Sequence, residues 1–198
     1  MENSRMGFIL AGGQSSRMGA EKAFLQFAGC TLLERAITAL RSVCEFAIVG
    51  DSAKFSSYGT VIEDVYPGRG PLAGIHAALT DSSAELNLML AVDMPLVSSE
   101  LLAFLFAAAA TTDAVVTVPH SARGFQPLCA VYRRPFATVA EQALKAEQNK
   151  IDALSAIIPV RVIEGEELAS GGFSDQVFVN LNTPEDLQTI RPGPDQTK

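Results

Sequence analysis

A glycine-rich segment followed by a lysine, Leu10–Gly19 and Lys22, contains residue types suited to binding phosphate. Gly12 and Gly13 come directly after an apolar run, so the main chain can turn sharply there and approach a ligand closely. Arg17 can hold a phosphate through two hydrogen bonds, and Lys22 adds a compact positive charge. The spacing is neither that of a Walker A loop nor the GxGxxG of dinucleotide sites. The alternative is a glycine turn with exposed basic residues, but the glycines and both cations together favour phosphate binding.

Asp93 follows the apolar run Leu88–Val92 and precedes Met94 and a proline. A carboxylate at the mouth of a buried strand is a hard oxygen ligand, which Mg2+ takes together with phosphates and waters. The alternative is that Asp93 caps the helix that follows. Because Ser98 and Ser99 can already serve as that cap, we expect Asp93 to be available to a metal.

Two further segments carry weaker signals. The stretch from Asp64 to Gly74 is rich in glycine and proline at the start of a predicted helix, whose free amides suit ligand oxygens. The alternative there is a plain connection. Asn180 and Asn182 are two residues apart, so both amides would face one side of a strand and could orient a polar ligand. The alternative is a strand end that leads into a helix cap at Thr183.

The elements that must position these residues alternate along the chain. Short apolar runs with little polar alternation predict strands that are buried on both faces: Phe8–Ala11, Phe46–Val49, Leu86–Val92, Ala114–Val118 and Leu128–Tyr132. Helix signals lie between them: Thr31 to Glu34 with capping-box spacing, Pro71, Ser98 and Ser99, Pro135 to about Glu147, and Thr183 to Asp186. This alternation predicts an α/β fold with a mostly parallel sheet, whose ligands bind beyond the carboxyl ends of the strands.

Composition limits the class of protein. The chain has 198 residues, 48% of them hydrophobic and 19% charged, which suits a globular domain rather than a disordered segment. A formal charge of −7 disfavours nucleic-acid or anionic membrane partners. Three cysteines without CxxC spacing disfavour a disulfide framework or zinc cluster and predict a cytoplasmic location. We expect one domain over residues 1–190 and a flexible tail over 191–198.

Several of these segments resemble one known family. The loop from Leu10 to Lys22, LAGGQSSRMGxxK, resembles the signature loop of nucleotidyltransferases that join an NTP to a phosphorylated acceptor. The whole chain resembles the molybdenum cofactor guanylyltransferases through IEDVYPGRGPLAGIHAAL (62–79), AVDMPLV (91–97), RGFQPL (123–128) and NLNTPEDL (180–187). The resemblance implies a three-layer α/β/α sandwich with a Rossmann-like nucleotidyltransferase sheet.

The resemblance also implies a reaction. GMP would pass from GTP to the phosphate of Mo-molybdopterin, giving molybdopterin guanine dinucleotide and pyrophosphate, with Mg2+ as the cofactor. The acceptor phosphate is already an anionic nucleophile near pH 7, so no catalytic histidine or cysteine is needed. Binding would involve no nucleic acid and no membrane. We expect a monomer that docks transiently with molybdopterin-handling proteins or molybdoenzymes.

The family pattern assigns roles to individual residues. The implied nucleotide-binding residues are Leu10, Ala11, Gly12, Gly13, Lys22, Asp64, Gly74 and Asp93. Arg17, Lys22 and Asp93 would act in catalysis, with Asp93 as the metal ligand. Asn180 and Asn182 would line the acceptor side, where Arg123 and Gln126 could also reach the pterin or its phosphate. Many relatives carry a side chain able to reach the nucleotide where Gly50 stands, so any contact at this position comes from the main chain.

Other readings stay open. One is a CTP-dependent molybdopterin cytidylyltransferase or a sugar-phosphate nucleotidyltransferase, because the first loop reads phosphates and not the base. Another is a non-catalytic nucleotide-binding adaptor. Retention of Arg17, Lys22 and Asp93 together disfavours the adaptor, since a pure binder needs no metal at the phosphates.

Overall fold

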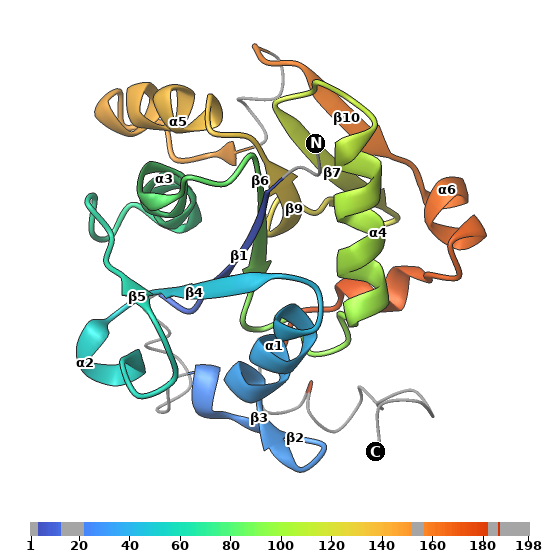
Figure 1. Ribbon diagram of the computed structural model, residues 1–198, viewed down its shortest axis with the longest axis horizontal. Coiled ribbons are helices and arrows are strands. Elements are labelled where there is room, and N and C mark those ends of the chain that lie inside the picture. Colours follow the sequence, from blue (N-terminus) through green and yellow to red (C-terminus); the bar gives the residue numbers. More distant parts are fainter. Residues whose placement is uncertain (1–3, 13–21, 152–156, 182–185, 187–198) are drawn as a thin grey trace.

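The computed structural model describes residues 4–12, 22–151, 157–181 and 186. The main sheet has the spatial order β10-β7-β9-β6-β1-β4-β5, and β8 pairs with β7 (Figure 1). Its strands are β1 (Arg5–Leu10), β4 (Glu45–Val49), β5 (Val61–Ile62), β6 (Leu86–Ala91), β7 (Val116–Ser121), β8 (Gly124–Phe125), β9 (Cys129–Tyr132) and β10 (Val160–Ile163). Along this order, β9 is antiparallel to both neighbours and all other pairs are parallel. The expected mostly parallel sheet is confirmed.

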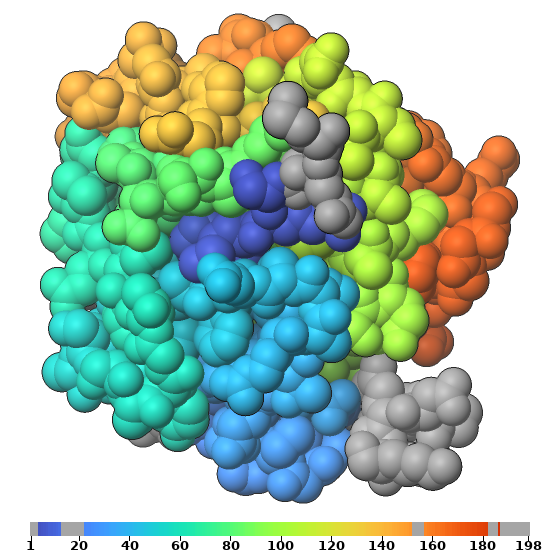
Figure 2. All heavy atoms as spheres, in the orientation of Figure 1, coloured from blue at the N-terminus to red at the C-terminus, as the bar shows by residue number. Residues whose placement is uncertain are grey.

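Helices cover both faces of this sheet. The described helices are α1 (Leu32–Arg41), α2 (Ser52–Phe55), α3 (Pro71–Asp81), α4 (Ser99–Ala110), α5 (Phe136–Lys145) and α6 (Gly165–Ser170), with the 3-10 turns η1 (Lys22–Phe24) and η3 (Asp175–Phe178). Side chains of α1 and α4 pack on one face, and those of α3 and α5 pack on the other. In Figure 2 the atoms of β1 are visible only in a narrow band between α3 and α1, beside α4. The three-layer α/β/α sandwich is thus confirmed.

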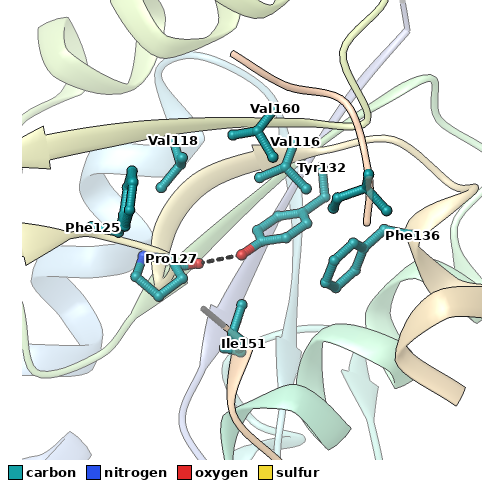
Figure 3. A pocket seen from close by; sticks show the side chains of 9 residues that line it. Val116, Val118, Phe125, Pro127, Tyr132, Phe136, Ile151 and Val160 are labelled. Atoms are coloured by element: carbon teal, nitrogen blue, oxygen red, sulfur yellow. Dashed lines mark hydrogen bonds between the residues drawn. The ribbon is translucent and has the colours of Figure 1, made fainter. Parts of the chain in front are cut away.

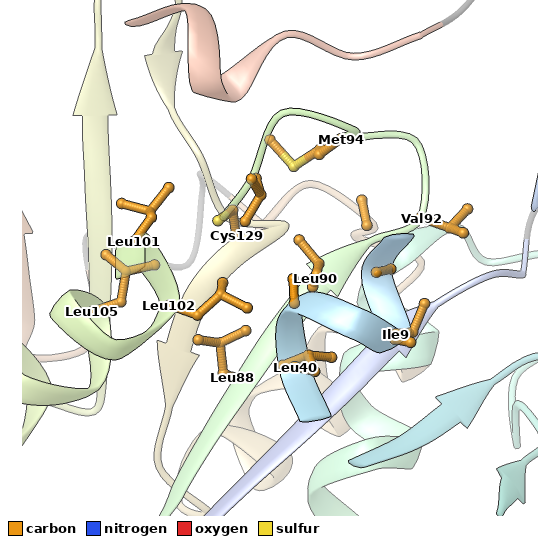
Figure 4. Close-up of a cluster of buried hydrophobic side chains, with 14 of the residues drawn as sticks. Ile9, Leu40, Leu88, Leu90, Val92, Met94, Leu101, Leu102, Leu105 and Cys129 are labelled. Atoms are coloured by element: carbon orange, nitrogen blue, oxygen red, sulfur yellow. The ribbon is translucent and has the colours of Figure 1, made fainter. Parts of the chain in front are cut away.

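Alternating side chains of the strands build two separate cores. Ile9 and Leu88 face α1 and α4, whereas Phe8 and Met89 face α3 and α5. All six residues of β6 are buried, which explains why this central strand forms a nearly continuous apolar run. Figure 4 shows the first core, in which Leu88 and Leu90 of β6 pack with Leu40 of α1 and with Leu101, Leu102 and Leu105 of α4. No helix in the described ranges is long and apolar enough to span a membrane.

The helix starts follow the sequence signals. Thr31 caps α1 through a complete capping box with Glu34, Pro71 is the first residue of α3, and Ser98 caps α4. The five apolar runs correspond to β1, β4, β6, β7 and β9. The structure adds the strands β5 and β10, which the sequence patterns did not predict. The helix expected from Thr183 and the tail 191–198 lie outside the described ranges, apart from Asp186.

The capping box of α1 leads to a stability prediction. Replacing Thr31 with Ala removes the hydroxyl that accepts the Glu34 amide at 3.1 Å, so we expect the free energy of unfolding to fall by about 1 kcal/mol. Hydrogen bonds from Thr31 lower the pKa of the Glu34 carboxyl. Only the part of the wild-type advantage that comes from the Thr31 hydroxyl donating to the Glu34 carboxylate should fade as the pH falls through that lowered pKa, and the part that comes from the Glu34 amide should remain.

Urea denaturation followed by circular dichroism measures this difference. Thr38→Ala on the exposed face of the same helix is the matched control, because the Thr38 hydroxyl only donates to the Glu34 carbonyl. We expect Thr38→Ala to change stability by less than about 0.5 kcal/mol. Equal losses in the two variants would show that the cap contributes nothing specific.

Candidate active site

The carboxyl ends of β1, β4 and β6 meet at one edge of the sheet. Leu10, the last residue of β1, lies opposite Val49 of β4 and Ala91 of β6. Beyond Leu10, the amides of Ala11 and Gly12 both donate to the Val49 carbonyl, at 3.0 and 3.1 Å. The chain therefore bends over the end of β4 as it leaves the sheet, where the sequence places its paired glycines. Gly13 and Arg17 lie outside the described residues.

Lys22 and Asp93 come together at this edge although 71 residues separate them. The Lys22 ammonium donates to Asp93 Oδ2 at 3.0 Å, and the two side chains are 23% and 18% exposed. A pair this sheltered is screened by salt less than a surface pair, yet it remains open to a ligand. The sequence predicted that the Asp93 carboxylate is available to a metal. The structure adds that this carboxylate is paired with Lys22, the lysine that follows the glycine-rich segment.

Main-chain contacts hold both members of the pair. Lys22 begins η1, whose next residue, Ala23, is fully buried, and the Leu25 amide donates to the Lys22 carbonyl at 3.0 Å. Asp93 follows the end of β6, and its carbonyl accepts the Leu181 amide at 2.8 Å. The Ser98 hydroxyl, rather than Asp93, caps α4, as the sequence suggests. Both charged groups are thus anchored to the sheet by neighbours that are buried.

Asp64 is a half-buried carboxylate close to Gly12, in the turn that follows β1. A Cβ added at Gly74 would lie 3.6 Å from Asp64 Oδ1, and one added at Gly12 would lie 4.0 Å from Oδ2. Asp64 Oδ1 is buried and has no hydrogen-bond partner among the residues that the structure describes, and burial raises the pKa of this carboxyl. An unpaired buried acceptor is costly, typically by about 1–3 kcal/mol, so its presence here suits a donor supplied by a ligand.

The loop that carries Asp64 is attached to α5 and to the residues directly after it. The Tyr66 hydroxyl donates to Glu141 at 3.4 Å, and Arg69 pairs with Glu147 at 3.0 Å on the surface. Tyr66 also packs edge-on against His76, with ring centroids 5.3 Å apart. His76 is buried, and burial lowers the pKa of its imidazole, which agrees with a structural role for this residue.

Gly50 has a packing explanation. A Cβ at this position would lie 2.9 Å from the ring of Phe55, closer than real Cβ contacts. Phe55 is fully buried and stacks on Phe24 with centroids 5.7 Å apart, while the Gly50 amide donates to the Ile62 carbonyl at 2.9 Å. Phe55 thus fills the space that a side chain at position 50 would need. Nothing in the sequence indicated that the Phe55 ring would occupy the space beside Gly50.

The described residues of this site suit a divalent cation that binds together with a substrate. Within the described ranges, no three His, Cys, Asp or Glu side chains converge as a ready metal cage. Asp93 Oδ2 contacts Lys22, and no described residue donates to Oδ1. One such carboxylate suits Mg2+, which is usually held by one or two carboxylates together with phosphates and waters. The donor set therefore fits a metal that arrives with a polyphosphate.

A cavity of about 350 Å³ opens directly after Asp93 in the chain. Met94, Leu128 and Phe178 give it apolar walls from three separate segments of the chain, and Phe125 and Pro127 extend them. Its polar lining residues are Arg123, Gln126 and Asn180. Of the two expected acceptor-side asparagines, Asn180 is thus on this cavity, and Asn182 lies outside the described residues. The sequence offered no signal for Met94 and Phe178, whose apolar side chains resemble ordinary core residues.

A second cavity has the character of a packing gap. It measures about 30 Å³ and lies between the sheet and α5, as Figure 3 shows. Its lining residues are Val116, Val118, Phe125, Pro127, Tyr132, Phe136, Ile151, Ile158 and Val160. The one polar side-chain group among these residues, the Tyr132 hydroxyl, donates to the Pro127 carbonyl at 2.8 Å, as the dashed line in Figure 3 marks. So small and apolar a space suits no polar substrate.

Comparisons with known proteins agree with this geometry. The family model described as MobA-like NTP transferase domain matches residues 7–159. A probable molybdenum cofactor guanylyltransferase of Carboxydothermus hydrogenoformans is 35% identical over 184 residues, 92% of each chain. One from Pelotomaculum thermopropionicum is 33% identical over 188 residues, 93% of this chain and 91% of the relative.

Solved structures give the same picture. Molybdopterin-guanine dinucleotide biosynthesis protein A from Archaeoglobus fulgidus superposes with a TM-score of 0.83 at 29% identity, covering 93% of this chain and 95% of that one. Rv0371c from Mycobacterium tuberculosis, solved in complex with manganese, has a TM-score of 0.60 at 19% identity, covering 83% and 89%. The second likeness concerns the fold alone.

Asp64 leads to a prediction with opposite signs for stability and binding. Burial raises the pKa of its carboxyl, so the charged form destabilises the folded protein increasingly as pH rises through that pKa. Asp64→Asn should therefore raise the melting temperature of the ligand-free protein at pH 8 and leave it unchanged below pH 3. If Asp64 receives a ligand donor, the same substitution should weaken nucleotide binding at pH 8.

Thermal denaturation at both pH values and calorimetric titration with GTP measure the two effects. Asp113→Asn is the matched control, because Asp113 is exposed in a loop. It should change neither the melting temperature nor the affinity for GTP. A destabilised Asp64→Asn at pH 8 would contradict the interpretation of Asp64 as an unpaired buried charge.

Proposed function

The chain belongs to the MobA-like NTP transferase domain family and is a nucleotidyltransferase, and from this premise we propose that it transfers GMP from GTP to the phosphate of Mo-molybdopterin. The products are molybdopterin guanine dinucleotide and pyrophosphate. The observation that carries this proposal is the contact of Lys22 with Asp93 at the carboxyl ends of the central strands, where Met94, the residue after Asp93, lines the large cavity. A triphosphate placed at this pair would meet a cation and a metal-ligating carboxylate at once.

The chemistry needs alignment and charge stabilisation more than proton transfer. An oxygen of the acceptor phosphate attacks the α-phosphorus of GTP, and the bond from that phosphorus to the oxygen bridging to the β-phosphate breaks. Pyrophosphate leaves with that electron pair. Lys22, together with Arg17, would stabilise the charge that develops on the phosphoryl oxygens and on pyrophosphate.

Asp93 would hold Mg2+ together with oxygens of the triphosphate. The bound cation supplies neutralisation of phosphate charge and a fixed geometry for the reacting groups. A structural neighbour solved with manganese supports a divalent cation in this fold. Lys22 contacts Asp93 Oδ2, so its ammonium would turn from this carboxylate towards the phosphates when nucleotide and cation bind.

The nucleoside would lie on the side of β4 and α3. Leu10, Ala11, Gly12 and Gly13 would present main-chain groups to it, and Asp64, close to Gly12 and Gly74, would accept from the base or ribose. Because Phe55 fills the space beside Gly50, main-chain groups rather than a side chain would read the base there. Preference for GTP rests on the relatives, which are named guanylyltransferases.

The first test is pyrophosphate release with each NTP in turn, using molybdopterin and its molybdenum-loaded form as acceptors in the presence of Mg2+. We expect pyrophosphate release with GTP to be much faster than with CTP, ATP or UTP. The proposed site would bind the phosphates of all four nucleotides but select guanine. Preference for CTP would reassign the enzyme to cytidylyl transfer. Absence of release with every NTP would contradict the proposed reaction altogether.

A second test removes the two charged groups. Lys22→Ala and Asp93→Ala should each lower kcat on the order of 100-fold or more, because each removes a group that stabilises transferring phosphates. Circular dichroism and melting curves should show that both variants remain folded. Lys145→Ala and Asp113→Ala, at exposed positions, are controls of matched charge and should keep near-normal turnover. A fully active Lys22→Ala or Asp93→Ala variant would exclude that residue from the mechanism.

A further inference from the structure

The amide of Gln126 is held in one orientation by the hairpin that joins β7 to β8. Its Nε2 group donates to the Ser121 hydroxyl at 3.0 Å and to the Gly124 carbonyl at 3.2 Å. The reversed amide would bring its oxygen against the Gly124 carbonyl oxygen, so the observed orientation is the favourable one. Both amide hydrogens are thereby engaged within the protein.

Among the described residues, the oxygen of the same amide has no such partner. No described residue donates to Gln126 Oε1, although Gln126 lines the large cavity. The main chain of Gln126 is also held, because its main-chain N–H donates to the Pro119 carbonyl and its main-chain carbonyl accepts from the Cys129 N–H. The cavity is therefore offered a fixed hydrogen-bond acceptor, which a ligand N–H group can satisfy.

The rest of the cavity suits a flat ring. Met94 and Phe178 are buried apolar walls, and the ring of Phe125 is 41% exposed at the same cavity. Phe125 is backed by His120 with centroids 4.8 Å apart, which limits its rotation. Apolar faces of a heterocycle can pack on these side chains while its polar edge meets Gln126. A volume of about 350 Å³ falls within the usual range for small-molecule sites.

The cavity is also correctly placed for a phosphorylated acceptor. Met94 directly follows Asp93 in the chain, and the amide after Asn180 donates to the Asp93 carbonyl at 2.8 Å. A ligand whose ring occupies the cavity could therefore extend its phosphate towards Lys22 and Asp93. Arg123, whose side chain has no hydrogen-bond or ion-pair partner among the described residues, adds positive charge at the cavity.

We propose that Gln126 is a specificity-determining residue for the acceptor of the proposed reaction, because its Oε1 accepts a hydrogen bond from an N–H group of the fused nitrogen heterocycle that binds in this cavity. The ligand class is a phosphorylated pterin, with its ring on Phe125 and Met94. Ser121 is a positioning residue, because it holds the Gln126 amide without contacting the ligand. The identity of the ring rests on the proposed function, whereas the acceptor oxygen and the apolar walls are features of this chain.

The test compares Gln126→Met, which keeps the side chain's length and removes its acceptor, with Gln142→Met on the exposed surface of α5. Steady-state pyrophosphate release gives KM for molybdopterin and for GTP, and calorimetry gives the Kd of GTP. We expect Gln126→Met to raise the acceptor KM about tenfold, as expected for losing one buried hydrogen bond to a ligand, and to leave the GTP values unchanged. Ser121→Ala should raise the acceptor KM less, and Gln142→Met should change nothing.

Fluorescence titration with 6-hydroxymethylpterin separates this inference from the proposed reaction. Wild-type protein should bind the probe, and Gln126→Met should bind it about tenfold more weakly. Because this variant also loses the two hydrogen bonds of the Gln126 Nε2 group, circular dichroism at the assay temperature should check that it is folded. Probe binding that is equal in the two proteins, or an unchanged acceptor KM, would overturn the role of Gln126. Normal pterin binding without pyrophosphate release from any NTP would instead overturn the proposed reaction and support the subsite.

Discussion

The contact between Lys22 and Asp93 joins the glycine-rich segment after β1 to the end of β6. It exists because β1 and β6 are parallel neighbours, with Leu10 opposite Ala91, so the residues that follow each strand emerge on the same edge of the sheet. Two complementary charges that are each about four-fifths buried hold one another until a ligand replaces either partner. In the proposed reaction a triphosphate takes the lysine and a cation takes the carboxylate, so the pair defines where the phosphates lie.

The two sides of this pair have different chemistry, which suits an enzyme that joins two unlike molecules. Towards β4 and α3, Gly12 is exposed, and Asp64 carries a buried oxygen for which the described residues provide no hydrogen-bond partner. Towards β9 and η3, the cavity combines apolar walls with the fixed amide of Gln126. The first side fits a nucleoside read through main-chain groups, and the second fits a ring with polar edges. Asp93 lies where the two sides meet.

Much of the fold could be predicted from the sequence, because its central strands are buried on both faces and its helices carry clear start signals. β5 and β10 were missed for a physical reason: β5 has two residues, and β10 is an edge strand that is mostly half-buried. The position of the candidate site could also be predicted, because ligands of open α/β sheets bind beyond the carboxyl ends of the strands. The Lys22 partner of Asp93, the ring of Phe55 beside Gly50 and the cavity walls Met94 and Phe178 could not be predicted, since each depends on distant segments meeting.

The most direct measurement of the central claim is a crystal structure with GTP and with Mn2+ in place of Mg2+, in which anomalous scattering locates the cation. The account predicts the Mn2+ peak on the Asp93 carboxylate, phosphate oxygens in contact with the Lys22 ammonium, and the guanine on the side of Asp64. A triphosphate and cation bound elsewhere, with Lys22 still paired to Asp93, would contradict it.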